Sequence, residues 1–355
     1  MWGDEMEQIK VPLHLCASGE IIAQDAFNNN GTILVRKDTP MNDYIRERLL
    51  MWGQTQVSIY THEPNEALYE TDKEEQVKES YVTALRSQKN IIENLSSGKR
   101  VDYKEFLVIS NLIFDNINDS NNIIQYLNEV KGYDDYTYTH GINTSFYCML
   151  ITKWMRMSDH ELKTAIQAGL LHDIGKADIP KQVLNKKEIL TREEYEIIKQ
   201  HTIYGYNKLV ALDNNNLISE EVRKSILLHH ERIDGSGYPY HSKAEDINFF
   251  ARIVSVADVF DAMTSDRIYK KRSSPFDAFE MFKTVGIGMF DPEIVNNFLK
   301  NIALYYTDAK VLLSDGRVGN VVYIPPQDIT RPIVKVELKY LDLAKQKEIK
   351  LLRVI

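Results

Sequence analysis

The chain is poor in cysteine and has no long apolar run. Its two cysteines, Cys16 and Cys148, exclude a disulfide framework and a cysteine-rich zinc module, and they fit a reducing compartment. Because no stretch of about 18 or more apolar residues occurs, we expect no membrane-spanning helix. The first residues also lack a basic region followed by an apolar stretch, so we expect no signal peptide and a cytoplasmic location.

The chain also lacks an excess of positive charge. Its formal net charge of -8 argues against a broad surface for DNA, other nucleic acids or anionic membranes, but leaves room for a small phosphate ligand held by a few local cations. A hydrophobic content of 43% and a charged content of 26% are ordinary for a globular protein. The length of 355 residues suggests about two or three domains.

The two ends of the chain predict small β-containing units. The sequence pattern of residues 1–65 predicts an α/β or β unit. Its expected elements are strands at 21–23, 32–35 and 56–60, a turn at 28–31 and a helix at 42–52. Residues 306–355 predict a β extension, with strand-like segments at 310–313, 318–323, 333–338 and 349–352 separated by turn residues.

The middle of the chain predicts helices. Residues 66–132 form an expected connector or regulatory region, with a long amphipathic helix at 66–98 and shorter helices near 102–118 and 120–131. The long helix either packs on the main domain or serves as a signalling connector and a homodimer contact. Residues 133–305 predict an almost entirely helical domain, which makes the fold class mainly α. Seven of the nine histidines fall between His140 and His241 of this domain.

The most informative stretch is His172-Asp173, which ends the apolar run 165–171. That run predicts a buried helix, and a polar pair at its end is costly unless something compensates it. A metal ion is the simplest compensation, and imidazole beside carboxylate suits Mn, Fe or Zn. The pair alone also fits a helix-terminal histidine followed by an N-capping aspartate.

Further candidate ligands follow in helical segments of the same domain. His140 opens an expected helix, His201 lies within an expected helix at 193–209, His229-His230 closes one at 220–228, and Asp258 lies within one at 251–263. A helical bundle can gather inward-pointing histidines and aspartates around metal ions. Taken singly, His140 fits a capping or core residue and His201 a surface residue, whereas a buried Asp258 is costly without a partner.

The joint order of these motifs resembles the HD-GYP family, a subgroup of the HD-domain metal-dependent phosphohydrolases. The resemblance covers roughly residues 133–303. The segments that carry it are Tyr136-Thr137 shortly before His140, His172-Asp173-Ile174-Gly175-Lys176, His229-His230-Glu231-Arg232-Ile233-Asp234-Gly235-Ser236-Gly237-Tyr238-Pro239, and Ala257-Asp258-Val259-Phe260-Asp261-Ala262-Met263-Thr264-Ser265-Asp266-Arg267. The resemblance implies an HD-type helical bundle flanked by the two small β-containing units.

The resemblance implies a cyclic di-GMP phosphodiesterase with two divalent metal ions, Fe or Mn in many members. Carried over residue by residue, Asp173 bridges the metals, and the metal ligands are His140, His172, Asp173, His201, His229, His230 and Asp258. Some members hold a third metal through a carboxylate one helical turn before the first histidine. Tyr136 stands there, and Asp134 and Asp135 are out of helical phase, so we predict a two-metal site and leave the role of His140 open.

The implied reaction is hydrolysis to pGpG, GMP or both. A metal-activated water attacks the phosphorus with Asp173 at the catalytic centre, while Lys176 acts as a point cation at the phosphate. Arg267 and Lys270 match the family's phosphate-binding cations. Without the resemblance, Lys176 would be a cation at a helix end, and Arg267 and Lys270 would be solvated surface charges.

The Gly-Tyr-Pro loop leaves alternatives open. Tyr238 can stack on a purine of the substrate or pack into the core, and the resemblance links the loop to protein partners. Two other functions also fit the motifs. The chain could hydrolyse another cyclic dinucleotide, or it could be a non-catalytic module that senses the nucleotide or binds a partner.

Overall fold

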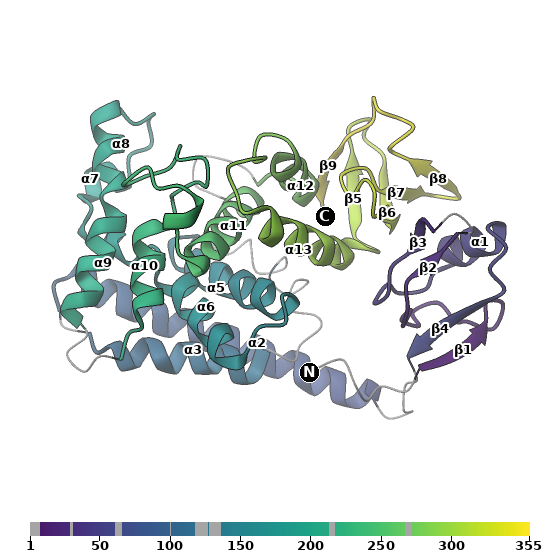
Figure 1. The fold of residues 1–355 in the computed structure, drawn as a ribbon, viewed down its shortest axis with the longest axis horizontal. Helices are drawn as coiled ribbons and strands as arrows, with labels where there is room; N and C mark the ends of the chain where they lie inside the picture. Colours follow the sequence, from purple (N-terminus) through teal and green to yellow (C-terminus); the bar gives the residue numbers. More distant parts are fainter. Residues whose placement is uncertain are drawn as a thin grey trace. The chain divides into compact units, whose positions relative to one another are not determined.

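A computed structural model describes residues 8–28, 31–60, 66–99, 101–117, 127, 136–212, 217–266 and 272–355. The chain forms two compact units (Figure 1). Unit 1 combines Met1–Thr71 with Leu299–Ile355, and unit 2 is Asp72–Phe298. The fold is mainly α with small β-containing parts, so the predicted fold class is confirmed.

The N-terminal part of unit 1 contains two strand pairs and one helix. Its elements are β1 (Gln8–Pro12), β2 (Ala26–Phe27), β3 (Ile33–Val35), α1 (Asp43–Met51) and β4 (Gln56–Tyr60), with β1 paired to β4 and β2 to β3. Helix α1 begins after Asn42, whose side chain accepts a hydrogen bond from the Ile45 amide. The predicted strand at 21–23 is wrong, because Ile21 and Ile22 form only single bridges.

The C-terminal part of unit 1 is an antiparallel sheet with strand order β8-β7-β6-β5-β9. Its strands are β5 (Lys310–Leu313), β6 (Val318–Tyr323), β7 (Ile333–Val336), β8 (Lys339–Asp342) and β9 (Leu351–Val354). The predicted strand at 333–338 extends two residues beyond the observed end of β7 at Val336. The backbone turns at Glu337, which has a φ of 53°, and the chain returns as β8.

The two parts of unit 1 share one hydrophobic core. Val322, Tyr323 and Ile333 of the sheet belong to the same buried cluster as Leu34 and Met41. The Tyr323 hydroxyl donates a hydrogen bond to the Leu34 carbonyl. Segments nearly 300 residues apart in the sequence therefore stabilise each other.

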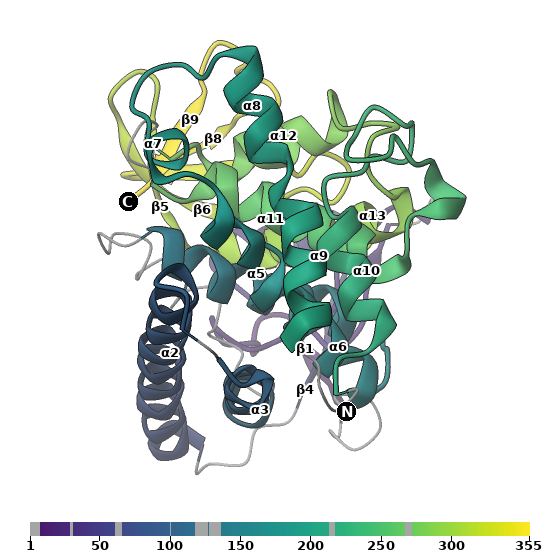
Figure 2. The ribbon, with the colours of Figure 1, turned by 90° about the vertical axis from the view of Figure 1, so that its left-hand side faces the viewer.

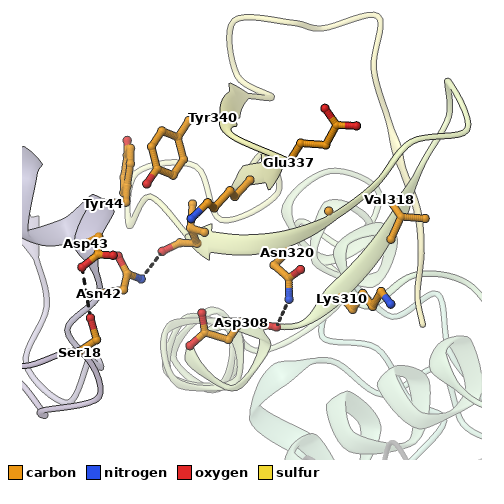
Figure 3. Close-up of a pocket in the computed structure, with 13 residues that line it drawn as sticks. Ser18, Asn42, Asp43, Tyr44, Asp308, Lys310, Val318, Asn320, Glu337 and Tyr340 are labelled. Carbon is orange, nitrogen blue, oxygen red and sulfur yellow. Dashed lines mark hydrogen bonds between the residues drawn. The ribbon is translucent and has the colours of Figure 1, made fainter.

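Unit 1 also contains a cavity of about 570 Å³ (Figure 3). The rings of Tyr44 and Tyr340 lie beside each other at one end of it, with centroids 5.1 Å apart. Asn320 donates a hydrogen bond to the Asp308 carbonyl in the same wall. None of the candidate metal ligands lines this cavity.

Unit 2 is helical, and α2 carries the chain into it from unit 1. Its elements are α2 (Glu66–Ser96), α3 (Tyr103–Ile117), α5 (Tyr136–Trp154), α6 (Asp159–Leu171), η1 (Ile174–Asp178), α7 (Lys181–Leu184), α8 (Arg192–Lys199), α9 (His201–Leu212), α10 (Glu220–Leu228), η2 (Ala244–Asp246), α11 (Phe249–Thr264), α12 (Pro275–Lys283) and α13 (Pro292–Ile302). Helix α13 leads back into unit 1, where η3 (Ala303–Tyr306) follows it. The helix expected near 120–131 lies outside the described residues, apart from position 127. Among the described helices, none is both long and apolar enough to cross a membrane.

The core of unit 2 is built on α5, α6 and α11, which pack against one another, with α9 and α10 alongside (Figure 2). Ser158 and Glu161 form a capping box that starts α6. The predicted apolar run 165–171 forms the end of α6 and is buried except for Gln167. Gly169 allows the close approach of α5, since a Cβ there would lie 2.7 Å from the Ser145 Cα.

Two predicted helix boundaries in unit 2 are wrong. The expected helix at 193–209 is interrupted at Gln200, so that α8 ends before it and α9 begins at His201. Helix α5 begins at Tyr136, which places His140 one turn inside the helix rather than at its opening. The side chain of Tyr136 is not described, and Asp134 and Asp135 lie outside the described residues.

Candidate metal centre

The predicted ligands converge in the core of unit 2 although they come from separate elements. Their places are α5 for His140, the junction of α6 and η1 for His172-Asp173, the first residue of α9 for His201, the end of α10 for His229-His230, and α11 for Asp258. Figure 2 shows these helices packed side by side. Two groups of potential ligand atoms result, each confined within 4.8 Å.

The first group contains His140, His172 and Asp173. The Nε2 atoms of His140 and His172 are 3.2 Å apart, and His172 Nε2 lies 3.3 Å from Asp173 Oδ2. Asp258 faces this group, with its Oδ1 3.1 Å from His140 Nε2. The group therefore presents both nitrogen and carboxylate oxygen atoms to one small volume.

The second group contains Asp173, His201, His229 and His230. The Nε2 atoms of His201 and His229 are 3.3 Å apart, and His201 Nε2 lies 3.4 Å from Asp173 Oδ1. The rings of His229 and His230 lie with their centroids 4.2 Å apart. Consecutive histidines at the end of α10 thus both contribute to this group.

Asp173 is common to both groups, and a different oxygen of its carboxylate faces each group. Its Oδ2 faces His172, and its Oδ1 faces His201. Oδ1 is buried and has no hydrogen-bond partner. Asp173 precedes η1 but makes no side-chain capping bond, so the N-cap interpretation of the His-Asp pair does not hold. A buried carboxylate oxygen without a hydrogen-bond donor is costly unless a cation compensates it.

Hydrogen bonds fix the orientation of four histidine rings. The Nδ1 atoms of His172, His201 and His229 each lie 2.8 Å from the carbonyl oxygen three residues earlier. His140 Nδ1 lies 2.7 Å from Asp261 Oδ2. Because these partners only accept hydrogen bonds, each Nδ1 carries a proton and each Nε2 faces the ligand groups, where a metal would take the place of any proton on it.

The protonation states of the second group suit metal binding. Burial lowers the pKa of His201 to about 4. Burial, together with the neighbouring histidines, also holds the pKa values of His229 and His230 well below the ordinary value. These imidazoles are therefore neutral at pH 7, which is the form that binds a metal.

The first group has a different charge balance. Burial lowers the pKa of His140, but hydrogen bonds and charges from Asp258 and Asp261 outweigh that effect and raise the pKa to about 9. Burial would raise the pKa of Asp173, whereas His172 and Lys176 hold it well below the usual range. The centre thus contains ionised carboxylates in a buried setting, where they attract cations strongly.

The predicted substrate-binding cations are only partly described. Lys176 Nζ donates to Asp173 Oδ2 at 2.5 Å, so this cation lies beside both ligand groups. About a third of the Lys176 side chain is exposed. Arg267 and Lys270 lie outside the described residues, and their predicted roles stay predictions.

Tyr238 of the Gly-Tyr-Pro loop stacks on a candidate ligand. Its ring centroid lies 4.6 Å from that of His230, with 24° between the ring planes. Lys199 Nζ lies 5.6 Å from the centre of the Tyr238 ring. The buried carboxylate of Glu231 accepts hydrogen bonds from the Tyr240 and Ser242 amides and so holds the loop. The ring is half-buried, so the structure leaves both predicted roles of Tyr238 open.

Sequence reasoning missed Asp261 as a functional candidate. Its carboxylate is fully buried on α11 and lies against His140 and Asn143. The available signal was its position three residues after Asp258 on the same apolar helix, because residues three apart lie on one helix face.

The residues present fit divalent metal ions. The donors are neutral imidazole nitrogens and carboxylate oxygens, a set that suits Mn, Fe and Zn. The unpartnered Asp173 Oδ1 is the atom that most requires a cation. The ring orientations are supported by hydrogen bonds to Nδ1, as is usual for metal-ligating histidines.

The chain is similar to known proteins over the helical part that holds the candidate ligands. The HD domain family model matches residues 112–294, which include every candidate ligand. A cyclic di-GMP phosphodiesterase of Pseudomonas aeruginosa is 35% identical over 215 residues, which cover 61% of this chain and 51% of that protein. A cyclic di-GMP phosphodiesterase of Thermotoga maritima is 34% identical over 224 residues, which cover 63% and 57%. The chain thus spans about half the length of these curated relatives.

Two further similar proteins are a phosphodiesterase named for another cyclic dinucleotide and a protein of solved structure. The 3'3'-cGAMP-specific phosphodiesterase 1 of Vibrio cholerae is 29% identical over 180 residues, which cover 50% of this chain and 41% of that protein. The solved structure of an HDG"Y"P protein from Bdellovibrio bacteriovorus has a TM-score of 0.51 and 14% identity, and covers 82% of this chain and 98% of that one. This structural likeness concerns the fold alone.

Proposed function

Because this chain belongs to the HD-GYP branch of the HD domain family, we propose that it is a metal-dependent phosphodiesterase that hydrolyses cyclic di-GMP. The observation that carries the proposal is the shared position of Asp173 between two groups of buried histidines. Relatives named as cyclic di-GMP phosphodiesterases support the substrate. The products are pGpG, GMP or both.

The proposed ligands hold two divalent metal ions, Fe or Mn. His140, His172, Asp173 and Asp258 would hold one ion, and Asp173, His201, His229 and His230 would hold the other. When bound, such ions supply a water of lowered pKa and stabilise charge on a phosphate oxygen. The protein contributes rings held by their Nδ1 hydrogen bonds, so the ligands need little rearrangement.

The remaining proposed residues act on the substrate. Lys176 lies beside Asp173 and carries a positive charge for a phosphate oxygen. Arg267 and Lys270 are proposed to bind the phosphates as well. Tyr238 is proposed to stack on a purine, as aromatic side chains do with bases.

A second candidate substrate is 3'3'-cGAMP. Two relatives from Vibrio cholerae named as 3'3'-cGAMP-specific phosphodiesterases match about half of this chain. The two substrates share the phosphodiester groups and one guanine, so the metal centre would act on either. Groups that contact the second base would decide between them.

We further propose a cytoplasmic location and two contacts with proteins. The Gly-Tyr-Pro loop would bind protein partners, and α2 would form a homodimer contact. Ultracentrifugation of the full chain tests the dimer, because an α2 contact would give twice the monomer mass of 41.1 kDa.

Product analysis tests the proposed function. The full chain, purified without oxygen and loaded with Mn²⁺ or Fe²⁺, is mixed with cyclic di-GMP or 3'3'-cGAMP, and the nucleotides are separated by chromatography. Asp173→Ala is the control, because it removes the shared ligand. Metal-dependent appearance of pGpG or GMP that is absent in Asp173→Ala supports the proposal. Faster hydrolysis of 3'3'-cGAMP would make it the substrate, and metal-filled protein without turnover on either nucleotide would overturn catalysis.

A further inference from the structure

A chain of hydrogen bonds leads from α2 to His140. The Tyr81 hydroxyl donates to Asn143 Oδ1 at 2.9 Å, and Asn143 Nδ2 donates to Asp261 Oδ1 at 3.1 Å. Asp261 Oδ2 lies 2.7 Å from His140 Nδ1. Three helices therefore contribute to one continuous path: α2 provides Tyr81, α5 provides Asn143 and His140, and α11 provides Asp261.

The path lies in the interior of unit 2. The exposed fraction is 1% for Tyr81, 1% for Asn143, 0% for Asp261 and 4% for His140. Hydrogen bonds in such an environment are not replaced by bonds to bulk water. Displacing one member therefore removes a buried hydrogen bond from the next one, which is costly.

The order of donors and acceptors lets each member orient the next. Because Asn143 Oδ1 accepts from the Tyr81 hydroxyl, the amide turns its nitrogen toward Asp261. Asp261 then keeps its second oxygen for His140 Nδ1, while Ser265 donates to the first at 2.9 Å. This bond holds the proton of His140 on Nδ1 and directs Nε2 toward Asp258 and His172.

Helix α2 also contacts α5 next to His140. The Gln88 side chain is buried, and a Cβ on Gly141 would lie 2.2 Å from its Nε2. The Tyr81 ring stacks on Phe146, with centroids 5.9 Å apart and 17° between the planes. Both contacts of α2 therefore fall on the part of α5 that directly follows His140.

We propose that Tyr81, Asn143 and Asp261 are positioning residues that orient His140, so that metal binding at the first ligand group depends on where α2 lies. The inference uses the metal centre of the proposed function. The implication for regulation comes from the course of α2 along the chain. Helix α2 is continuous across the boundary between Thr71 and Asp72, where unit 1 gives way to unit 2. A change that shifts or rotates α2 would reach His140 through the side chains of Tyr81, Asn143 and Asp261.

Metal binding by Tyr81→Phe tests the proposal. This variant removes one hydroxyl and keeps the buried ring. Tyr103→Phe is the matched control, because Tyr103 is equally buried and its hydroxyl donates to the side-chain oxygen of Gln167 at 2.7 Å, outside the path to His140. Binding of Mn²⁺ alone to each full-length variant is followed by electron paramagnetic resonance, and thermal unfolding without metal is measured in parallel.

The two variants separate positioning from a merely structural role. We expect Tyr81→Phe to weaken one class of Mn²⁺ sites by about 3- to 30-fold, the range of couplings carried by side-chain networks. Tyr103→Phe should lower the unfolding temperature similarly and bind Mn²⁺ like the wild type. Asp261→Asn, which acts directly on His140, should weaken the same class of sites by about 10- to 100-fold.

Two results would overturn the inference. One is wild-type Mn²⁺ binding by Tyr81→Phe, and the other is an equal loss of binding in Tyr81→Phe and Tyr103→Phe. Because the probe is Mn²⁺ without nucleotide, the outcome does not depend on turnover. A chain that binds Mn²⁺ through this path but cleaves neither cyclic dinucleotide would retain the inference and lose the proposed function.

Discussion

A methyl group added at Gly175 would collide with the backbone that carries His201. A Cβ at this position of η1 would lie 1.9 Å from the His201 carbonyl oxygen and 2.4 Å from the Gly205 nitrogen. Ordinary van der Waals contact starts at 3.4 Å, so η1 and α9 must separate by 1.5 Å in Gly175→Ala. The clashing atoms are backbone, so no side-chain rotation relieves the contact.

This separation should affect metal binding more than folding. Overpacking of this kind costs about 1–3 kcal/mol, which lowers the unfolding temperature of a domain of this size by roughly 2–10 °C. The distance of 3.4 Å between His201 Nε2 and Asp173 Oδ1 would grow, because the two residues lie on the separating elements. A misplacement of about 1 Å at a reacting centre can slow turnover by about 10²-fold.

The assay combines calorimetry, Mn²⁺ binding and cyclic di-GMP turnover. Gly286→Ala is the control, since a Cβ there would lie 3.1 Å from Phe282 Cα and Phe290 Cδ2, away from the candidate ligands. It should lower the unfolding temperature slightly and keep Mn²⁺ binding. If Gly175→Ala binds Mn²⁺ and turns over substrate like the wild type, the close approach of η1 and α9 does not position His201, and the reasoning fails.

Two further changes test the charge at the centre and the buried thiols. Lys176→Ala should slow turnover by about 10²-fold and weaken substrate binding with full Mn²⁺ content, because its cation acts on the phosphate; loss of Mn²⁺ from this variant would contradict that role. Burial raises the pKa of Cys16 to about 12 and that of Cys148 well above 9. The folded chain therefore keeps both thiols protonated at pH values at which the thiols of an unfolded chain ionise. At pH 8, iodoacetamide should therefore label Cys16 in the native chain roughly 10³-fold more slowly than in guanidinium. The native labelling rate should rise tenfold per pH unit. The contribution of the two neutral thiols to the free energy of unfolding should be lost above pH 9. Mass spectrometry of each cysteine peptide gives the rates, and rapid native labelling at pH 8 would refute the burial argument.

Local patterns in the sequence predicted much of unit 2. The apolar run 165–171 fixed the end of α6, and the boundary of α10 before His229 agrees with the expected helix at 220–228. The motif order also placed residues from five elements in one centre, and the structure brings these residues together. Such features depend on residues close in sequence, where apolar periodicity is informative.

Features that depend on distant partners were not predicted. The break at Gln200 sets His201 against Gly175, and apolar periodicity continues through it. Asp261 has a role only because Asn143 and His140 of another helix face it. Tertiary contacts decide both features, and a single sequence does not display them.

The shared core of unit 1 gives the molecule a discontinuous architecture. Leu34 and Met41 are covered by Val322 and Tyr323, so each end of the chain completes the interior that the other begins. The helical unit is in effect an insertion into a smaller module, and it is tethered to that module by two chain crossings, one in α2 and one in α13. Mechanical strain in the smaller module would therefore enter the helical unit at two points, and the one in α2 carries the hydrogen-bonded path to His140 described above.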